Sequence, residues 1–216
     1  MMRNRKVKIP YDSQIVLDAM SKGDATLVMD NESATQVNVL DTEEQAETTV
    51  PLPKVIASIA GSDPSGALPK SVGFLVVVVK SGQGAIYHMD SDTLMFSKVF
   101  RRYMVRKSQG KSQLKYLKTK GKSRLGSRIR LRETRLFFQE LTGCIDHIMK
   151  DHGERIQKVF MACDPGTKGY WWSEFPPTRL PLKDSRMEKI PFHVDNPTEE
   201  IMDRVVFKLY QPQSVF

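Results

Sequence analysis

The chain has 216 residues, of which 40% are hydrophobic and 27% charged, and its formal net charge is +8. This composition excludes a chain that is disordered throughout, because it holds enough apolar residues to build a sizeable core. The longest apolar run, Val72–Val79, is far shorter than the roughly 20 residues that cross a bilayer, and the N-terminus lacks a signal-peptide core, so we expect a soluble, cytoplasmic protein.

The N-terminal part has the pattern of a small β-rich extension over residues 1–50, which carries no functional signal. Its short runs typical of strands are Gln14–Leu17, Thr26–Met29 and Gln36–Leu40. The polar stretch Asp41–Thr49 predicts a loop, and the prolines that follow it predict a linker over residues 51–69.

A domain over residues 70–216 begins with three predicted strands. Gly73–Val79 is a continuous β-branched run, typical of a strand buried on both faces. Gly82 and Gly84 favour a hairpin turn, because glycine tolerates positive φ. Ala85–His88 and Leu94–Val105 complete a predicted meander.

Helices and strands alternate in the rest of the chain. Glu133–Asp151 has apolar residues at three- and four-residue spacing, which predicts a helix that Gly153 ends. Arg155–Ala162 predicts a strand, Asp164–Thr167 a turn and Gly169–Phe175 a short aromatic segment, and a last helix begins at Asn196 as N-cap. The fold class predicted is α/β (α+β), a mixed sheet flanked by helices.

All of the excess positive charge lies in one segment. Residues 98–132, which we call the basic segment, hold fourteen Lys or Arg and no Asp or Glu, whereas residues 1–97 carry −4 and residues 133–216 carry −2. Such a cluster must be solvated, disordered or matched by a polyanion, usually nucleic acid. On charge alone, a solvated loop without chemistry is an equal alternative.

The centre of this segment is a predicted loop that contains Gly110 and Gln113. Gln113–Lys120 could form a short helix, and Gly121–Ser127 is again a predicted loop. A glycine and a glutamine three residues apart can bring a backbone amide and a carboxamide close to a ligand, although many loops contain this pair by chance.

Other chemistry-bearing residues have simpler interpretations. Cys144 and Cys163 lie apart without zinc-ligand spacing and are expected to be small buried residues. Asp90 and Asp92 suit a turn, and the aromatic run Tyr170–Trp172 suits core packing better than base stacking. We expect neither a metal nor a cofactor. The histidines are expected in surface or core positions: His88, His147, His152 and His193.

The order of the motifs resembles the Vms-type release-factor-like domain of the ankyrin-repeat and zinc-finger peptidyl-tRNA hydrolases. The resemblance covers about residues 70–208. It is carried by Arg102–Arg106, Gln109–Gln113, Lys120–Lys122, Gly126–Arg130, Asp184–Arg186, Ile190-Pro191 and Pro197-Thr198.

The resemblance implies a fold like the central domain of the class-I release factor of eukaryotes and archaea. It also implies endonucleolytic removal of the 3′ CCA end, with the nascent peptide, from tRNA on stalled large ribosomal subunits. Gln113 and Gly110 are then the catalytic-loop residues. Lys111 stands where the family has a second glycine, only Arg130 clearly matches the motif that ends the family's basic stretch, and zinc-finger and ankyrin sequences are absent.

Because a carboxamide does not titrate, Gln113 would position the reacting groups, while cations hold phosphates. The expected partners are tRNA and the large ribosomal subunit, with a monomeric protein and no role for membrane or DNA. Two alternatives are hydrolysis of the peptidyl-tRNA ester and RNA binding without catalysis. The RNA-binding candidates are Arg101, Arg102, Arg106, Lys107, Lys111, Lys115, Lys120, Lys122, Arg124, Arg128, Arg130 and Arg132.

Overall fold

The computed structural model describes residues 4–30, 33–41, 46–60, 68–80, 82–104 and 125–212. These residues form two compact units. The first unit takes its residues from Met1–Phe74, His88–Phe96 and Met202–Phe216, and the second from Leu75–Tyr87 and Ser97–Ile201. The domain boundaries at residues 50 and 70 stay predictions.

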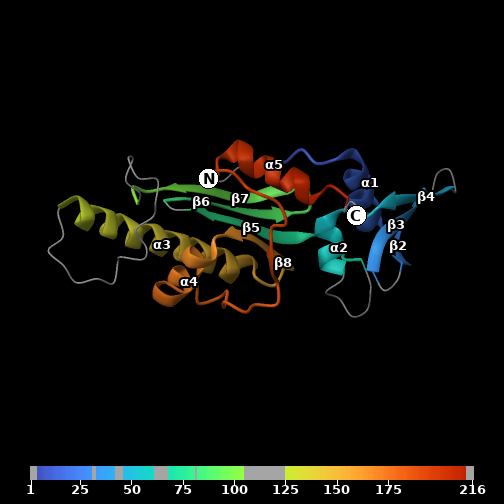
Figure 1. Ribbon diagram of the computed structural model, residues 1–216. Coiled ribbons are helices and arrows are strands. Elements are labelled where there is room, and N and C mark those ends of the chain that lie inside the picture. The colour runs from blue at the N-terminus through green and yellow to red at the C-terminus, as the bar shows by residue number, and fades with distance from the viewer. Residues whose placement is uncertain are drawn as a thin grey trace. The chain divides into compact units, whose positions relative to one another are not determined.

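The larger sheet is mixed and has six strands in the order β1-β7-β6-β5-β8-β9 (Figure 1). Strand β1 pairs antiparallel with β7, and β8 pairs parallel with β9. Because β5, β6 and β7 are sheet neighbours joined by short turns, they form the predicted meander, and the α/β fold class is confirmed. The strands are β1 (Arg5–Lys6), β5 (Gly73–Lys80), β6 (Gln83–Asp90), β7 (Thr93–Arg101), β8 (Lys158–Cys163) and β9 (Met187–Lys189).

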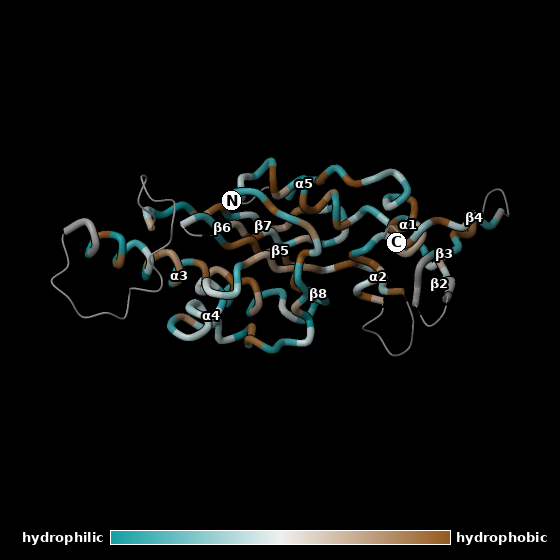
Figure 2. The backbone as a smooth tube through the Cα atoms, in the orientation of Figure 1, coloured by the Kyte–Doolittle hydropathy of each residue, from teal (hydrophilic) through white to brown (hydrophobic). Residues whose placement is uncertain are grey.

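Strand β5 is buried on both faces, as its β-branched run predicts. Every residue from Phe74 to Val79 is at most 1% exposed. Figure 2 shows a hydrophobic stretch along this strand. Full burial of each Val or Leu side chain contributes about 1.5–3 kcal/mol, so this strand is a major source of the free energy that holds the sheet together.

Helix α3 (Leu125–His152) packs on one face of the sheet in the second unit. A Cβ at Gly84 of β6 would lie 3.2 Å from the Phe137 ring and 3.1 Å from Leu141, so glycine permits the close approach of helix and strand. The predicted helix at Glu133–Asp151 is confirmed, but it begins eight residues earlier, and the loop predicted for residues 121–127 is wrong from Leu125 onward.

Helix α4 (Pro165–Glu174) replaces the turn and the aromatic segment that the sequence predicts. The carboxylate of Asp164 accepts a hydrogen bond of 2.9 Å from the Thr167 backbone N–H, and Pro165 occupies the first helical position. Asp followed by Pro is also an N-cap signal, which the turn prediction overlooked. Trp171 and Trp172 are 0% and 9% exposed, so their predicted place in the core is confirmed.

Helix α5 (Glu199–Leu209) is the predicted last helix, with a different cap. The Thr198 hydroxyl accepts a hydrogen bond of 3.2 Å from the Ile201 backbone N–H, three residues along. Thr198 is therefore the capping residue, and the assignment of Asn196 as N-cap is wrong.

The N-terminal region is richer in helix than the sequence predicts. The strands at Thr26–Met29 and Gln36–Leu40 are confirmed, but Gln14–Leu17 is helical, because Ser13, Val16, Leu17 and Met20 form a buried face at helical spacing. The loop predicted over Asp41–Thr49 is wrong from Ala46 onward, where β4 begins, and the predicted linker over residues 51–69 contains helix α2. The elements here are α1 (Tyr11–Lys22), α2 (Lys54–Ala60) and an antiparallel sheet of β2 (Ala25–Asp30), β3 (Ser33–Asp41) and β4 (Ala46–Pro51).

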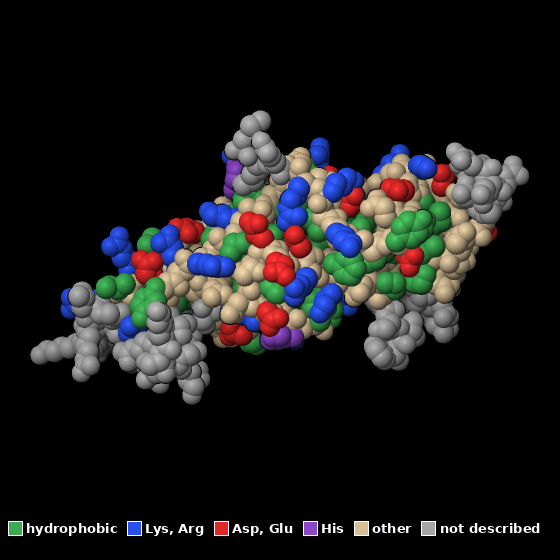
Figure 3. Space-filling model, turned by 90° about the horizontal axis from the view of Figure 1, so that it is seen from above, with side chains coloured by type: hydrophobic (Ala, Val, Ile, Leu, Met, Phe, Trp, Pro, Cys, Tyr) green, Lys and Arg blue, Asp and Glu red, His purple; other side chains and the backbone are tan. Residues whose placement is uncertain are grey.

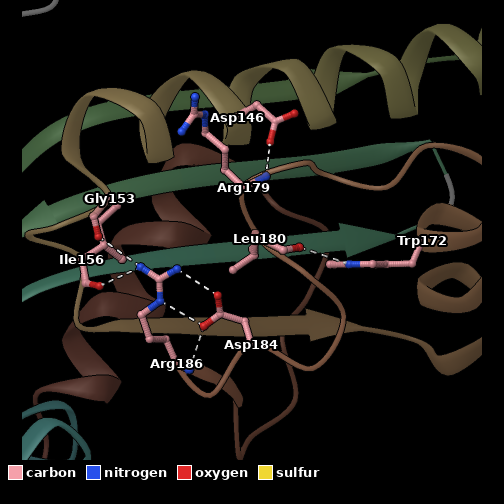
Figure 4. A network of polar contacts seen from close by, with 8 residues as sticks. All are labelled: Asp146, Gly153, Ile156, Trp172, Arg179, Leu180, Asp184 and Arg186. Atoms are coloured by element: carbon pink, nitrogen blue, oxygen red, sulfur yellow. Dashed lines mark hydrogen bonds and ion pairs between the residues drawn. The ribbon is translucent and has the colours of Figure 1, made fainter.

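An ion pair between Arg186 and Asp184 fastens the chain between α4 and β9 to the end of α3 (Figure 4). Arg186 Nη2 donates to Asp184 Oδ2 at 2.8 Å, and Nε donates to Oδ1 at 2.9 Å. Arg186 Nη1 donates to the Gly153 carbonyl at 3.1 Å and the Ile156 carbonyl at 3.4 Å. The Asp184-Ser-Arg186 motif therefore has a structural role.

Replacing Arg186 should destabilise the fold by about 2–3 kcal/mol, because the Asp184 carboxylate and two carbonyls lose a charged donor. Urea denaturation of Arg186→Ala measures this loss. The control is Arg155→Ala, whose exposed side chain should contribute within about 0.5 kcal/mol.

The same loss should depend on pH. The hydrogen bond from Arg186 holds the pKa of Asp184 below its ordinary value. Stability from a lowered carboxyl pKa is present above the unfolded pKa of about 4 and is lost as the pH falls through the folded pKa. The difference between wild type and Arg186→Ala should therefore shrink below about pH 4. An equal difference in neutral and strongly acidic buffer would contradict this linkage.

Candidate nucleic-acid interface

The basic segment is described at its two ends, residues 98–104 and 125–132. Its centre lies outside the described residues, and so do the predicted catalytic residues Gly110 and Gln113 and seven of the predicted RNA-binding residues: Arg106, Lys107, Lys111, Lys115, Lys120, Lys122 and Arg124. Their roles stay predictions.

The first end of the segment is fastened to the turn between β5 and β6. The Arg102 backbone N–H donates to the Gly82 carbonyl at 2.8 Å. Gly82 has φ of +79°, and a Cβ there would lie 2.5 Å from the Arg102 carbonyl oxygen. A side chain would block this approach, so the predicted turn glycine is confirmed and its position fixes where the basic segment leaves the sheet.

The Arg102 side chain then joins this end to α3. Its guanidinium contacts Glu140 and, at 3.3 Å, Glu133. The hydrogen bond and charge of Glu140, followed by those of Glu133, raise the pKa of Arg102 above its ordinary value. The basic segment thus begins at the end of β7 and ends on α3, and Arg102 connects these two elements. In this arrangement two carboxylates neutralise the charge of Arg102, and its predicted contact with RNA stays a prediction.

Helix α3 presents a row of arginines at the other end of the segment. Arg128, Arg132 and Arg135 are exposed and lie four and three residues apart, so they share one helical face. The first turn has no acidic residue, so the positive end of the helix dipole adds to these charges. Figure 3 shows basic side chains gathered near this end of α3. Arg135 lies outside the basic segment, and only the helical spacing identifies it as a member of the row.

Two exposed apolar side chains accompany these cations. Tyr103 is 49% exposed just after β7, and Ile129 is 47% exposed on the first turns of α3. Apolar and aromatic surface beside arginines suits nucleic acid, because bases stack on it while phosphates contact the cations.

Arg130 differs from its neighbours on the helix. Its residue is only 7% exposed, and its backbone carbonyl accepts a hydrogen bond of 2.8 Å from the Thr134 hydroxyl. Arg101 by contrast is exposed at the end of β7. The described candidates with accessible side chains are therefore Arg101, Arg128 and Arg132.

The basic segment leaves the sheet at the edge where several strands have their carboxyl ends. Strands β5 and β7 run in the same direction because each is antiparallel to β6. The last residues of β5 and β8, Lys80 and Cys163, line one cavity of about 800 Å³, so these strands also end at the same edge. Open α/β sheets bind ligands outside this edge. Sequence reasoning missed the cavity, because three distant segments build it.

The histidines and the two cysteines differ in how far they are buried. His88 is 3% exposed, whereas His147 and His193 are exposed near Asp151 and Asp195, as the expectation of core and surface positions allows. Both cysteines are free and half-buried rather than fully buried, which corrects the expectation. Burial raises the pKa of Cys144 to about 11 and that of Cys163 to about 12, so both are thiols at neutral pH.

Removing the ion pairs of Arg102 should destabilise the contact between α3 and the chain that follows β7. We expect Arg102→Gln and Glu140→Gln each to lower the melting temperature, and the double variant to lose less than the sum, because the two residues act as one pair. Calorimetry of the four proteins gives the coupling, which added salt should weaken since both side chains are partly exposed. Lys150→Gln, an exposed charge on α3, is the control; additive losses from Arg102 and Glu140 would contradict the pairing.

Among the described residues, no helix is long and apolar enough to cross a membrane. A solved structure named "Vms1 mitochondrial localization core" aligns with 84% of this chain and 77% of its own, at 14% identity and a TM-score of 0.46. No curated protein matches the chain. The family model described as "Bacteroidetes VLRF1 release factor" matches residues 74–215, which include the basic segment, the arginine row and the cavity. The predicted release-factor-like resemblance is thus confirmed, and the chain belongs to the Bacteroidetes VLRF1 release factor family.

Proposed function

We propose that this chain cleaves peptidyl-tRNA on stalled large ribosomal subunits in the cytoplasm, removing the 3′ CCA end together with the nascent peptide. One observation carries the proposal. Within the region that matches a release factor family, residues 98–132 contain fourteen Lys or Arg and no Asp or Glu, with Gly110 and Gln113 at their centre. A release factor meets its substrate amid ribosomal and transfer RNA, and such a segment suits that surrounding.

The cations would bind the RNA and relieve charge, whereas Gln113 would orient the reacting groups. The accessible arginines at the ends of the segment, Arg101, Arg128 and Arg132, would dock the domain on RNA phosphates, while cations near the centre relieve charge on the reacting phosphate. Gln113 would orient the reacting groups, since its carboxamide neither takes nor gives a proton at any accessible pH.

The reaction that fits these groups is attack by a ribose 2′-hydroxyl oxygen on the adjacent phosphorus. The new O–P bond forms as the bond from phosphorus to the 5′ oxygen of the next nucleotide breaks, and the proton of the hydroxyl ends on that 5′ oxygen. The products are a 2′,3′-cyclic phosphate on the shortened tRNA and a 5′-hydroxyl on the released fragment. This step needs in-line placement of the hydroxyl and relief of charge on the phosphate, and Gln113 and the central cations would supply them.

The family description favours a second candidate, hydrolysis of the peptidyl-tRNA ester, because release factors act on that ester. In this reaction Gln113 would orient a water molecule toward the ester carbonyl. The tRNA product separates the two: a full-length tRNA with intact CCA indicates ester hydrolysis, and a tRNA shortened at its 3′ end indicates strand cleavage.

Gln113→Ala should lose at least about 100-fold in the rate of peptidyl-tRNA cleavage while keeping its affinity for large subunits, because positioning is lost and the cations remain. Purified subunits that carry a labelled peptidyl-tRNA serve for both measurements, gel sizing of tRNA and sedimentation. Gln211→Ala, which alters an exposed glutamine outside the basic segment, is the control. Unchanged cleavage by Gln113→Ala would remove Gln113 from the mechanism, and no cleavage by wild type would leave RNA binding alone.

The outer and central cations should have separable effects. The double variant Arg128→Ala/Arg132→Ala should reduce the slope of log affinity against log salt by about 1.4–1.8, since each of two phosphate contacts contributes about 0.7–0.9, with the saturated rate unchanged. Lys111→Ala should instead lower the saturated rate. The charge-matched control is Lys150→Ala/Lys183→Ala, which removes two exposed lysines outside the basic segment. Equal slopes in both double variants would contradict docking by the arginine row.

A further inference from the structure

The cavity at the carboxyl edge of the sheet has walls of three kinds. Ala162, Pro191 and Phe192 give it apolar surface at the end of β8 and after β9. Lys80 and Lys189, from the ends of β5 and β9, add two positive charges. Gln83, His193 and Asn196 add polar groups that can donate hydrogen bonds.

These walls fit a ligand that is flat and apolar at one end and anionic at the other. The volume of about 800 Å³ lies within the range of about 300–1,000 Å³ that is typical of small-molecule sites. Apolar surface can hold the faces of a base, amide groups can pair with its edge, and the two lysines can hold a phosphate. A nucleotide has all of these parts.

The one carboxylate that lines the cavity does not favour a cation. Asp164 caps α4, and its Oδ1 accepts the Thr167 backbone N–H at 2.9 Å. Its charge therefore faces the positive end of a helix dipole, which offsets it. The lysine charges dominate the rest of the lining, so an anion is the better occupant.

The cavity also lies at the root of the basic segment. Gln83 lines it, and its neighbour Gly82 accepts the hydrogen bond from the Arg102 backbone where the segment leaves β7. An RNA strand bound where the basic segment leaves β7 would therefore lie near the mouth of the cavity. A nucleotide next to the cut could enter it and fix the register of the strand.

We propose that this cavity binds one nucleotide of single-stranded RNA, with the base against Ala162, Pro191 and Phe192 and a phosphate between Lys80 and Lys189. This inference rests on the proposed function for its substrate. It adds a subsite that selects which phosphate reaches the centre of the basic segment.

Cys163 offers a direct probe, because its thiol lines the cavity whereas Cys144 on α3 does not. Both thiols are half-buried, and their raised pKa values make alkylation slow at neutral pH. Alkylation of the full-length protein by N-ethylmaleimide in mildly alkaline buffer, followed by mass spectrometry, gives both rates from one sample. Cys144 is then the internal reference for any effect of the ligand on the whole fold.

Adenosine monophosphate and the trinucleotide CCA should slow alkylation of Cys163 about tenfold at ten times their dissociation constant, and leave that of Cys144 unchanged. Adenosine or inorganic phosphate alone should protect less, since each fills one part of the cavity. Protection by a short acidic peptide but by neither nucleotide would overturn the proposal in favour of a peptide site. The absence of protection by either nucleotide up to about 10 mM, which corresponds to negligible affinity, would overturn it outright.

Two variants test the geometry. Ala162→Phe fills the cavity without changing charge, and Lys80→Ala/Lys189→Ala removes the phosphate contacts without filling it; both should abolish nucleotide protection in the folded protein. The control Lys150→Ala/Lys183→Ala should keep it. Because the new phenyl ring in Ala162→Phe can shield Cys163 directly, the Lys80→Ala/Lys189→Ala variant is the decisive one. Nucleotide protection of Cys163 that survives in this lysine variant would overturn the proposal.

The outcomes separate this inference from the proposed function. Protection of Cys163 by nucleotides in a protein that leaves peptidyl-tRNA intact would keep the subsite and remove the cleavage activity. Cleavage at an unchanged position by both cavity variants would keep the activity and remove the subsite.

Discussion

The concentration of positive charge in residues 98–132 is the main physical constraint on this structure. The fourteen Lys and Arg side chains of the segment repel one another because no acidic residue lies among them in the sequence. This repulsion is reduced where the segment leaves β7, since Glu133 and Glu140 pair with Arg102. The first turn of α3 contains no acidic residue, and the side chains of Arg128, Arg132 and Arg135 are exposed along that helix. The protein therefore neutralises Arg102, which holds the start of the segment in place, and leaves the arginines of α3 exposed for contact with a polyanion.

The direction of the strands explains why binding groups gather where they do. Because β5, β7 and β8 end at the same edge, the exit of the basic segment and the cavity are neighbours although their residues are far apart in the chain. The buried strand β5 makes this edge rigid, and Gly82 lets the end of β7 approach it closely. A mobile strand of RNA would thus meet a preformed edge, which lowers the entropy lost on binding.

Local patterns predicted the elements, whereas distant contacts decided the site. The β-branched run of β5 and the apolar face of α3 identified a strand and a helix, because each pattern is complete within one segment. Gln14–Leu17 was misassigned because a few β-prone residues also fit a helical face, which tertiary packing selects. The role of Arg102 could not be predicted, since its partners lie 31 and 38 residues further along the chain. The cavity was missed for the same reason.

In the proposed reaction, the role given to Gln113 limits what the protein can contribute chemically. It cannot supply or remove a proton, so catalysis must come from placing the nucleophile and stabilising charge. Ester hydrolysis and strand cleavage have these needs in common and differ in which bond lies at the centre. The choice between them therefore depends on how far the RNA strand advances past the basic segment. The proposed subsite, by holding one nucleotide at the sheet edge, would fix that advance, so binding groups on the fold would decide the outcome of the reaction rather than the residue nearest the bond.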